Sequence, residues 1–174
     1  MQRPVSWPAV LTSILFAPVL FAAGPASDAV SPGQAATVIG PLNPLLTDGA
    51  ELLEAGHYAL GVRVTLQGLE QPSTPRDQAA GHSNVCAGFA ALKRWAEALE
   101  HCNKALELDR SNWRTYNNRA AVFVGLQQYD LAMTDVNAGL ELAPGSATLL
   151  KSREVVIQHH DAATRARWRK PDKA

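Results

Sequence analysis

The sequence has no excess of charge of either sign. Its 174 residues include 16 lysines and arginines and 16 aspartates and glutamates, so the formal net charge is zero. A chain that binds nucleic acid gains affinity from a basic excess that neutralises phosphates. The balance of charge therefore argues against nucleic acid as a partner. Hydrophobic residues make up 47% of the chain, which is enough to form a core.

Motifs that hold phosphates, metals or catalytic nucleophiles are also missing. The sequence has no glycine-rich phosphate loop and no nucleophile elbow. His159 and His160 are adjacent, so they diverge on a helix, and no cysteine or carboxylate accompanies them at the spacing of a metal site. We therefore expect no metal, no cofactor and no small-molecule substrate.

Long apolar runs are confined to the N-terminus. A basic start is followed by an apolar segment, about Val10 to Ala23, and then by small residues. This order is typical of a Sec-type secretory signal. The apolar segment is interrupted by Pro18 and is shorter than the ~20 residues that span a bilayer, although an uncleaved anchor is the alternative. We predict a signal peptide over residues 1–26, cut between residues 23 and 29, and a periplasmic or secreted protein.

Two further segments are predicted to lie outside the folded part. Residues 27–41 mix Ser, Pro, Gly, Gln and Ala with little periodicity, which is typical of a flexible leader. Residues 167–174 form a basic tail, which we expect to be solvated. No segment after the signal is long and apolar enough to cross a membrane, so the mature chain is not expected to span one.

The middle of the chain repeats itself. Residues 79–112 align with residues 113–146 without a gap, and each unit is 34 residues long. Phe89 aligns with Phe123, and the segment ALEL aligns with GLEL near the end of each unit. Apolar residues recur at helical spacing on either side of the short turns LKRW and LQQY. Each unit is therefore predicted to be a hairpin of two helices.

Small residues occupy matching places where two helices would cross closely. These are Cys86, Ala98 and Ala105 in the first unit and Ala120, Ala132 and Gly139 in the second. With the 34-residue period, the paired aromatics Trp95 and Tyr129 and the closing LELAP, the pattern resembles the tetratricopeptide repeat (TPR) family. One position departs from the family pattern: the first unit has Arg110 where the second unit has Pro144, the residue usual in the family. The resemblance implies an all-α fold, a short α-solenoid of stacked hairpins.

Two further segments complete this solenoid. An earlier, diverged hairpin covers residues 42–75, where Gly49 and Gly56 fit the same frame. Its segment VRVTL is β-prone alone, but we expect a helix because the frame around it holds. Residues 147–166 are predicted to form an amphipathic helix that caps the last hairpin. The expected fold is thus about three TPR hairpins plus a C-terminal capping helix.

The chain has two cysteines, and one of them lies in a triplet that looks reactive. His101, Cys102 and Asn103 are residue types of a thiol hydrolase, but neighbours on a helix point about 100° apart and do not converge. In the hairpin frame Cys86 and Cys102 each lie eight residues from Arg94, at the centre of the turn, and on the inward face. We predict a disulfide between them; two reduced, buried cysteines are the alternative.

The resemblance also indicates where a partner would bind. In the family, the first helix of each hairpin lines an inner groove, and an asparagine there hydrogen-bonds an extended peptide. An amide suits this role because it donates and accepts at once. The lysines of a carboxylate clamp are absent, since alanine or serine stands at the equivalent places Ala80, Ser83 and Ala87. The predicted partner contacts are Asn84, Arg114, Asn117 and Asn118, and solvated side chains are the alternative.

One charged pair is expected inside the second unit. Arg119 stands where an apolar residue is usual, and Asp135 lies at a comparable height on the second helix of the same hairpin. Their equivalents in the preceding unit are Val85 and His101. We therefore predict an Arg119–Asp135 ion pair and place His101 at a hairpin edge.

These observations predict a non-enzymatic interaction module that binds another protein or peptide through a concave groove. Two alternatives stay open. One is a structural subunit of a cell-envelope assembly. The other is an enzyme that uses Cys102.

Overall fold

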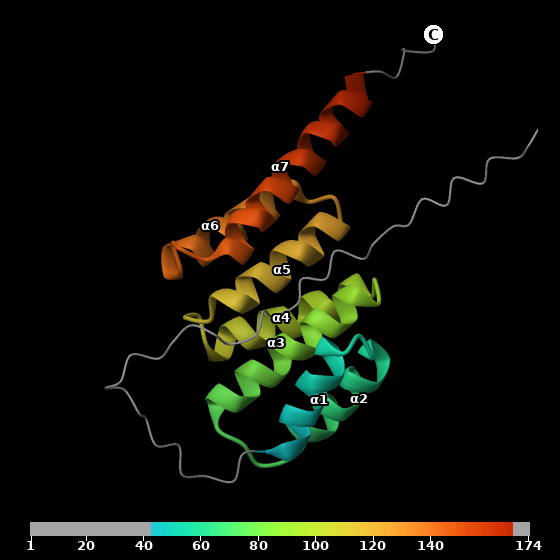
Figure 1. The fold of residues 1–174 in the computed structure, drawn as a ribbon, viewed down its shortest axis with the longest axis vertical. Helices are drawn as coiled ribbons and strands as arrows, with labels where there is room; N and C mark the ends of the chain where they lie inside the picture. The colour runs from blue at the N-terminus through green and yellow to red at the C-terminus, as the bar shows by residue number, and fades with distance from the viewer. Residues whose placement is uncertain (1–42, 169–174) are drawn as a thin grey trace, which may run out of the picture.

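The computed structural model describes residues 43–168, and seven helices follow one another there without a strand (Figure 1). The predicted signal peptide, the leader and residues 169–174 of the predicted tail lie outside these residues. No helix in the described part is long and apolar enough to cross a membrane. The helices are α1 (Pro44–Glu54), α2 (Tyr58–Leu69), α3 (Pro75–Ala91), α4 (Trp95–Leu108), α5 (Trp113–Gly125), α6 (Tyr129–Leu142) and α7 (Ala147–Trp168).

Consecutive helices pack as hairpins. α1 packs on α2, α3 on α4 and α5 on α6, and α7 lies against both α5 and α6. This arrangement of three hairpins and a final helix confirms the predicted all-α solenoid (Figure 1). The β-prone segment VRVTL lies inside α2, as expected. The capping helix extends to Trp168, two residues past the predicted end.

The stack is curved. Each odd-numbered helix contacts the next one, α1 with α3, α3 with α5 and α5 with α7. The even-numbered helices α2, α4 and α6 make no such contacts with one another. Because neighbours in the odd layer lie closer together than neighbours in the even layer, α1, α3, α5 and α7 form the concave side. We call these four helices the inner layer.

The three hairpins turn in the same way. Two residues before each second helix the backbone has a positive φ, at Gly56 (82°), Lys93 (58°) and Gln127 (60°). This left-handed region favours glycine, which has no Cβ to clash. The first hairpin alone keeps the glycine, yet all three bend at the equivalent residue. The shared turn supports the interpretation of residues 42–75 as a diverged copy of the same unit.

The connector between the first two hairpins ends in a strong helix start. Thr74 Oγ1 accepts from the backbone N–H of Asp77 at 3.1 Å, and the Asp77 carboxylate accepts in return, which makes a capping box. Pro75 occupies the first helical position, where its missing N–H costs nothing. α3 therefore begins four residues before Ala79, where the repeat frame starts.

The hairpins cross closely because small residues lie at the crossings. A Cβ added to Gly49 of α1 would lie 2.9 Å from the backbone N of Thr65 on α2. In the second hairpin Ala98 is fully buried beside the two cysteines. Two clusters of buried hydrophobic residues follow from these crossings. One is formed by Val62, Val85, Cys86, Phe89, Ala98, Cys102 and Val122. The other is formed by Ala120, Ala132, Val136 and Val156.

Candidate functional site

The four predicted partner contacts lie on two neighbouring helices of the inner layer. α3 carries Asn84, and α5 carries Arg114, Asn117 and Asn118. Their accessibility differs. Arg114 is exposed, Asn84 and Asn118 are partly buried, and Asn117 is buried. The structure thus brings three of the four to positions that a partner can reach.

Arg114 is held against an aromatic ring. Its guanidinium carbon lies 4.5 Å from the centre of the Trp113 ring. Such a cation–π contact orients the planar guanidinium while the residue as a whole stays exposed. Arg114 therefore offers N–H donors and a positive charge at the N-terminal end of α5.

Asn118 links the two helices. Its Nδ2 donates to the backbone oxygen and to Oγ of Ser83 on α3, at 3.3 Å each. Thr115 of α5 also donates to Ser83 Oγ, at 3.0 Å. These bonds fix the register of α5 on α3, so part of the hydrogen-bonding capacity of Asn118 is used inside the protein.

Asn117 is not available as a partner contact, which corrects the prediction. It is only 4% exposed, and its Oδ1 accepts a 2.6 Å hydrogen bond from Ser152 of α7. The reason lies in helix geometry: adjacent residues are rotated by about 100°, so Asn117 and Asn118 face different sides of α5. Asn118 faces α3, whereas Asn117 faces α7 and is covered by it.

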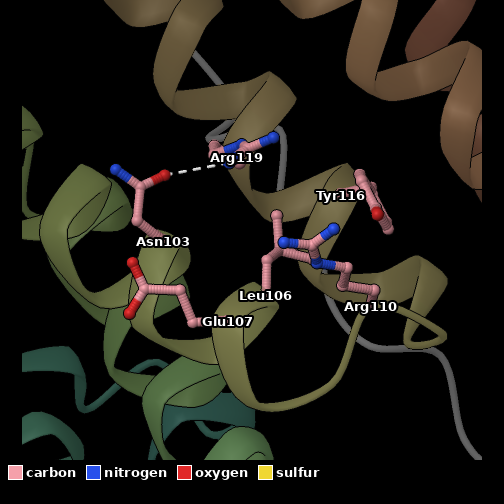
Figure 2. Close-up of a pocket in the computed structure, with 6 residues that line it drawn as sticks. All are labelled: Asn103, Leu106, Glu107, Arg110, Tyr116 and Arg119. Carbon is pink, nitrogen blue, oxygen red and sulfur yellow. Dashed lines mark hydrogen bonds between the residues drawn. The ribbon is translucent and has the colours of Figure 1, made fainter.

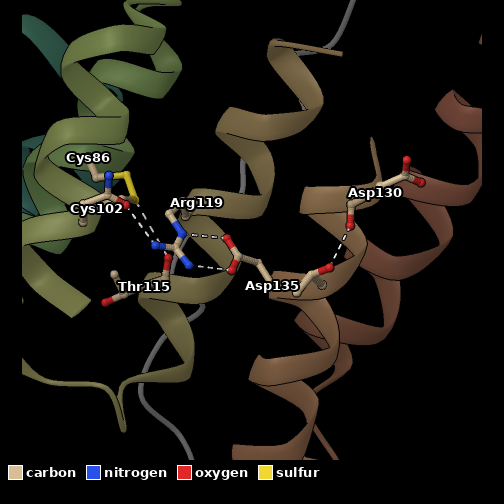
Figure 3. A network of polar contacts seen from close by, with 8 residues as sticks. Cys86, Cys102, Thr115, Arg119, Asp130 and Asp135 are labelled. Atoms are coloured by element: carbon tan, nitrogen blue, oxygen red, sulfur yellow. Dashed lines mark hydrogen bonds and ion pairs between the residues drawn. A yellow bond between two sulfur atoms is a disulfide. The ribbon is translucent and has the colours of Figure 1, made fainter. Parts of the chain in front are cut away.

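Cys86 and Cys102 form a disulfide in the structure, as the hairpin frame predicted (Figure 3). Their Cα atoms are 5.2 Å apart, and both residues are fully buried. Cys102 Sγ lies 3.9 Å from the backbone oxygen of Thr115 on α5. In this state Cys102 has no thiol to act as a nucleophile, so the arrangement argues against the Cys102 enzyme.

The predicted ion pair between Arg119 and Asp135 is also present (Figure 3). Nε and Nη2 of Arg119 donate to the two carboxylate oxygens of Asp135, both at 2.8 Å. The side chains are 22% and 5% exposed respectively. The hydrogen bonds from Arg119 to Asp135 raise the pKa of the guanidinium further above its usual range. Arg119 Nη1 donates to Asn103 Oδ1 at 2.9 Å, which ties α5 to α4.

A shallow hollow lies between α4 and α5, beside this pair (Figure 2). Its volume is about 320 Å³, and it is lined by both signs of charge and by one aromatic ring. Its lining comes from α4, from the connector after α4 and from α5. The lining residues are Asn103, Leu106, Glu107, Arg110, Tyr116 and Arg119.

Two histidines meet on the α3–α4 hairpin, a contact that the sequence did not predict. Nδ1 of His82 lies 2.9 Å from Nδ1 of His101, and both rings are partly buried. Val85 and His101 are the repeat equivalents of Arg119 and Asp135, but the residue that contacts His101 is His82, about one helical turn before Val85. Burial lowers the pKa of both rings; Lys104 lowers both further, and Glu100 opposes the shift. His82 also lowers the pKa of His101.

This contact predicts a stability that depends on pH. Both histidines have a pKa below the ordinary value of 6.5, so the folded chain takes up protons less readily than the unfolded one. The contribution is fully present above pH 6.5 and is lost as the pH falls through the lowered pKa values. We expect the melting temperature, measured by thermal denaturation, to decrease as the pH is lowered below 6.5. His101→Gln should flatten this fall, and the exposed control His57→Gln should not. An unchanged profile in His101→Gln would contradict the assignment.

Comparisons with known proteins agree with the fold. No protein-family model matches the chain. Peptidyl-prolyl cis-trans isomerase FKBP4 of Bos taurus is 34% identical over 79 residues, which is 45% of this chain and 17% of that protein. The chain therefore spans about a fifth of the length of the curated relatives that it matches.

Two solved structures cover more of the chain. The first TPR domain of the human RPAP3 protein has a TM-score of 0.62 and 24% identity, over 70% of this chain and 93% of that one. The first TPR of Spaghetti (RPAP3), bound to the HSP90 peptide SRMEEVD, has a TM-score of 0.59 and 25% identity, over 66% and 89%. The chain thus shares the helical-repeat fold of TPR domains, and one domain of this fold is bound to a peptide.

Proposed function

We propose that this chain is an exported TPR protein that binds an extended polypeptide along its inner layer. Binding is the whole of its mechanism, with no covalent step. The observation that carries the proposal is the curvature: the inner layer forms the concave side, and it carries Asn84, Arg114 and Asn118 on two adjacent helices.

The likeness to a peptide-bound domain supports this proposal. The first TPR of Spaghetti (RPAP3) holds the HSP90 peptide SRMEEVD, and its fold covers 66% of this chain. Peptide backbones present alternating donors and acceptors, and an asparagine amide can satisfy both. Asn84 and Asn118 occupy the same position in consecutive repeats, so they offer such amides on successive helices.

The chemistry around these amides favours recognition of the backbone over recognition of a C-terminal carboxylate. Ala80 is exposed and Ala87 partly buried on α3, where a carboxylate clamp would have charged side chains. Arg114 supplies one positive charge, which suits an acidic side chain on the partner. We therefore propose that the partner is an extended segment that lies along α3 and α5.

Export is supported by two separate features. The N-terminal sequence has the order of a secretory signal. The Cys86–Cys102 disulfide suits an oxidising compartment, because disulfides are rare where thiols are kept reduced.

A peptide selection tests the binding function. A random peptide library is panned against the wild-type chain, and the affinity of the best peptide is measured by fluorescence polarisation. Asn84→Ala together with Arg114→Ala should weaken binding by roughly tenfold, since each lost hydrogen bond costs about 0.5–1.5 kcal/mol, or more when it is charge-assisted. Asn118→Ala is measured separately, because it also removes the bonds to Ser83.

The matched control is Asn137→Ala, which changes an exposed asparagine on α6 outside the inner layer. It should bind the peptide as the wild type does, and circular dichroism should show all variants equally helical. If no peptide is selected, or if the Asn84/Arg114 variant binds it equally well, the inner layer is not the binding surface.

A further inference from the structure

The contact between His82 and His101 has no part in the proposed peptide site. We propose that these two histidines form a binding site for a divalent transition metal ion, with Zn²⁺, Ni²⁺ and Cu²⁺ as the chemical class. His82 Nδ1 and His101 Nδ1 would be the two protein ligands, and water would complete the coordination. Imidazole nitrogen is a good ligand for all three ions.

The distance between the two nitrogens fits a shared ion. Nδ1 of His82 and Nδ1 of His101 are 2.9 Å apart. Two nitrogens that each lie about 2.0–2.1 Å from a metal are separated by about 2.9 Å at a right angle and about 3.4 Å at the tetrahedral angle. The separation of the two nitrogens therefore needs to change by no more than about half an ångström, together with a rotation of the rings that aims both lone pairs at the ion.

The protonation state of the pair also fits. A metal binds the neutral imidazole, and burial lowers the pKa of both rings, which favours that form at pH 7. In the unbound state one Nδ1–H donates to the other Nδ1. When the ion binds, the hydrogen of that ring moves to its Nε2, so that both Nδ1 atoms are ligands. Because both residues are only partly buried, water can reach the ion.

The disulfide holds the two ligands at this spacing. His101 is next to Cys102, and His82 lies one helical turn before Cys86. The bond joins α3 to α4 at that level, so the helices that carry the histidines cannot separate there. Ligands that are already in place bind at a smaller entropic cost.

The charges that surround the pair are close to balanced. Lys104 and Glu100 of α4 both act on the histidines, and the lysine Nζ lies 2.7 Å from the glutamate Oε1. The ammonium that would repel a cation is thus paired with a carboxylate. The described residues hold no cluster of three or more metal-binding side chains. The site is therefore an open one with two protein ligands, weaker than a four-ligand structural zinc site.

Calorimetric titration of the untagged full chain with Zn²⁺ alone, at pH 7.5, tests the proposal. The wild type should bind one ion, and His82→Gln and His101→Gln should each weaken binding at least tenfold. Loss of even a group that only supports a metal ligand typically costs 10–100-fold. The chain has five histidines, and the other three supply matched controls: His57→Gln, and His159→Gln with His160→Gln. These controls should bind as the wild type does.

A second measurement needs no variant and so does not depend on how the variants fold. Paramagnetic Cu²⁺ added to the ¹⁵N-histidine-labelled wild type should broaden the ring signals of His82 and His101 first. Broadening of His159 and His160 first would overturn the proposal. So would the absence of Zn²⁺ binding, or Zn²⁺ binding that survives in His82→Gln.

Discussion

Asp135→Ala is expected to lower the free energy of unfolding by about 3 kcal/mol, because it leaves Arg119 charged and partly buried without its partner. The two residues are bonded at both carboxylate oxygens, and Asp135 is only 5% exposed. Arg119 stays charged at any ordinary pH, so it cannot relieve the loss by releasing a proton. Urea denaturation followed by circular dichroism measures the change.

Two further variants separate the orphaned charge from the loss of contacts. Arg119→Val with Asp135→Ala removes both charges and gives position 119 the residue that the preceding repeat has at Val85. This double variant should recover much of the stability, since replacing both members of a buried pair with apolar groups is often nearly neutral. The control is Asp130→Ala, which changes an exposed aspartate on α6, the helix that carries Asp135. It should change the free energy of unfolding by less than about 0.5 kcal/mol. A double variant as unstable as Asp135→Ala would show that the orphaned charge is not the cause.

Reduction of the Cys86–Cys102 disulfide is expected to lower the free energy of unfolding by about 3 kcal/mol. The bond closes a loop of 16 residues, and its loss gives that segment more freedom in the unfolded chain. For a chain of this size the change corresponds to roughly 10 °C in melting temperature. Differential scanning calorimetry with and without reductant measures it, after intact mass has confirmed the redox state.

Alkylation of the purified protein unfolded in urea, without reductant, shows whether the bond exists, because both cysteines are fully buried in the folded chain. No labelled thiol is expected, and two labelled thiols would contradict the disulfide. The variant Cys86→Ala with Cys102→Ala serves as the control for the calorimetry, because its melting temperature should not respond to reductant. A response in that variant would mean that the reductant acts on something other than this bond.

The repeat made much of the fold predictable. Helix hairpins follow from the 34-residue period because each residue type recurs at the same structural place. The same frame predicted the ion pair between Arg119 and Asp135 and the pairing of the two cysteines, which the structure contains. It also outweighed the β propensity of VRVTL, which packs as part of α2. In VRVTL the helical period of the repeat and the tertiary contacts determined the secondary structure, not the local residue preference.

Contacts between hairpins were harder to predict. The frame says which residues are equivalent, but not which side of a helix the next hairpin covers. Asn117 was expected on the surface, yet α7 buries it and Ser152 donates to it. The His82–His101 contact escaped for a related reason. Val85 is the repeat equivalent of Arg119 and has no polar group to offer His101, whereas the ring of His82, about one helical turn earlier on α3, reaches it.

The separation of α2, α4 and α6 from one another has a mechanical consequence. When the solenoid bends, the outer helices change their spacing without breaking any packed interface between them. The inner layer resists this bending, because hydrogen bonds from Thr115 of α5 to Ser83 and from Ser152 of α7 to Asn117 hold its helices together. The solenoid is therefore expected to be stiff along its inner layer and more easily deformed along α2, α4 and α6. A peptide seated on the concave face would set the curvature of the whole stack.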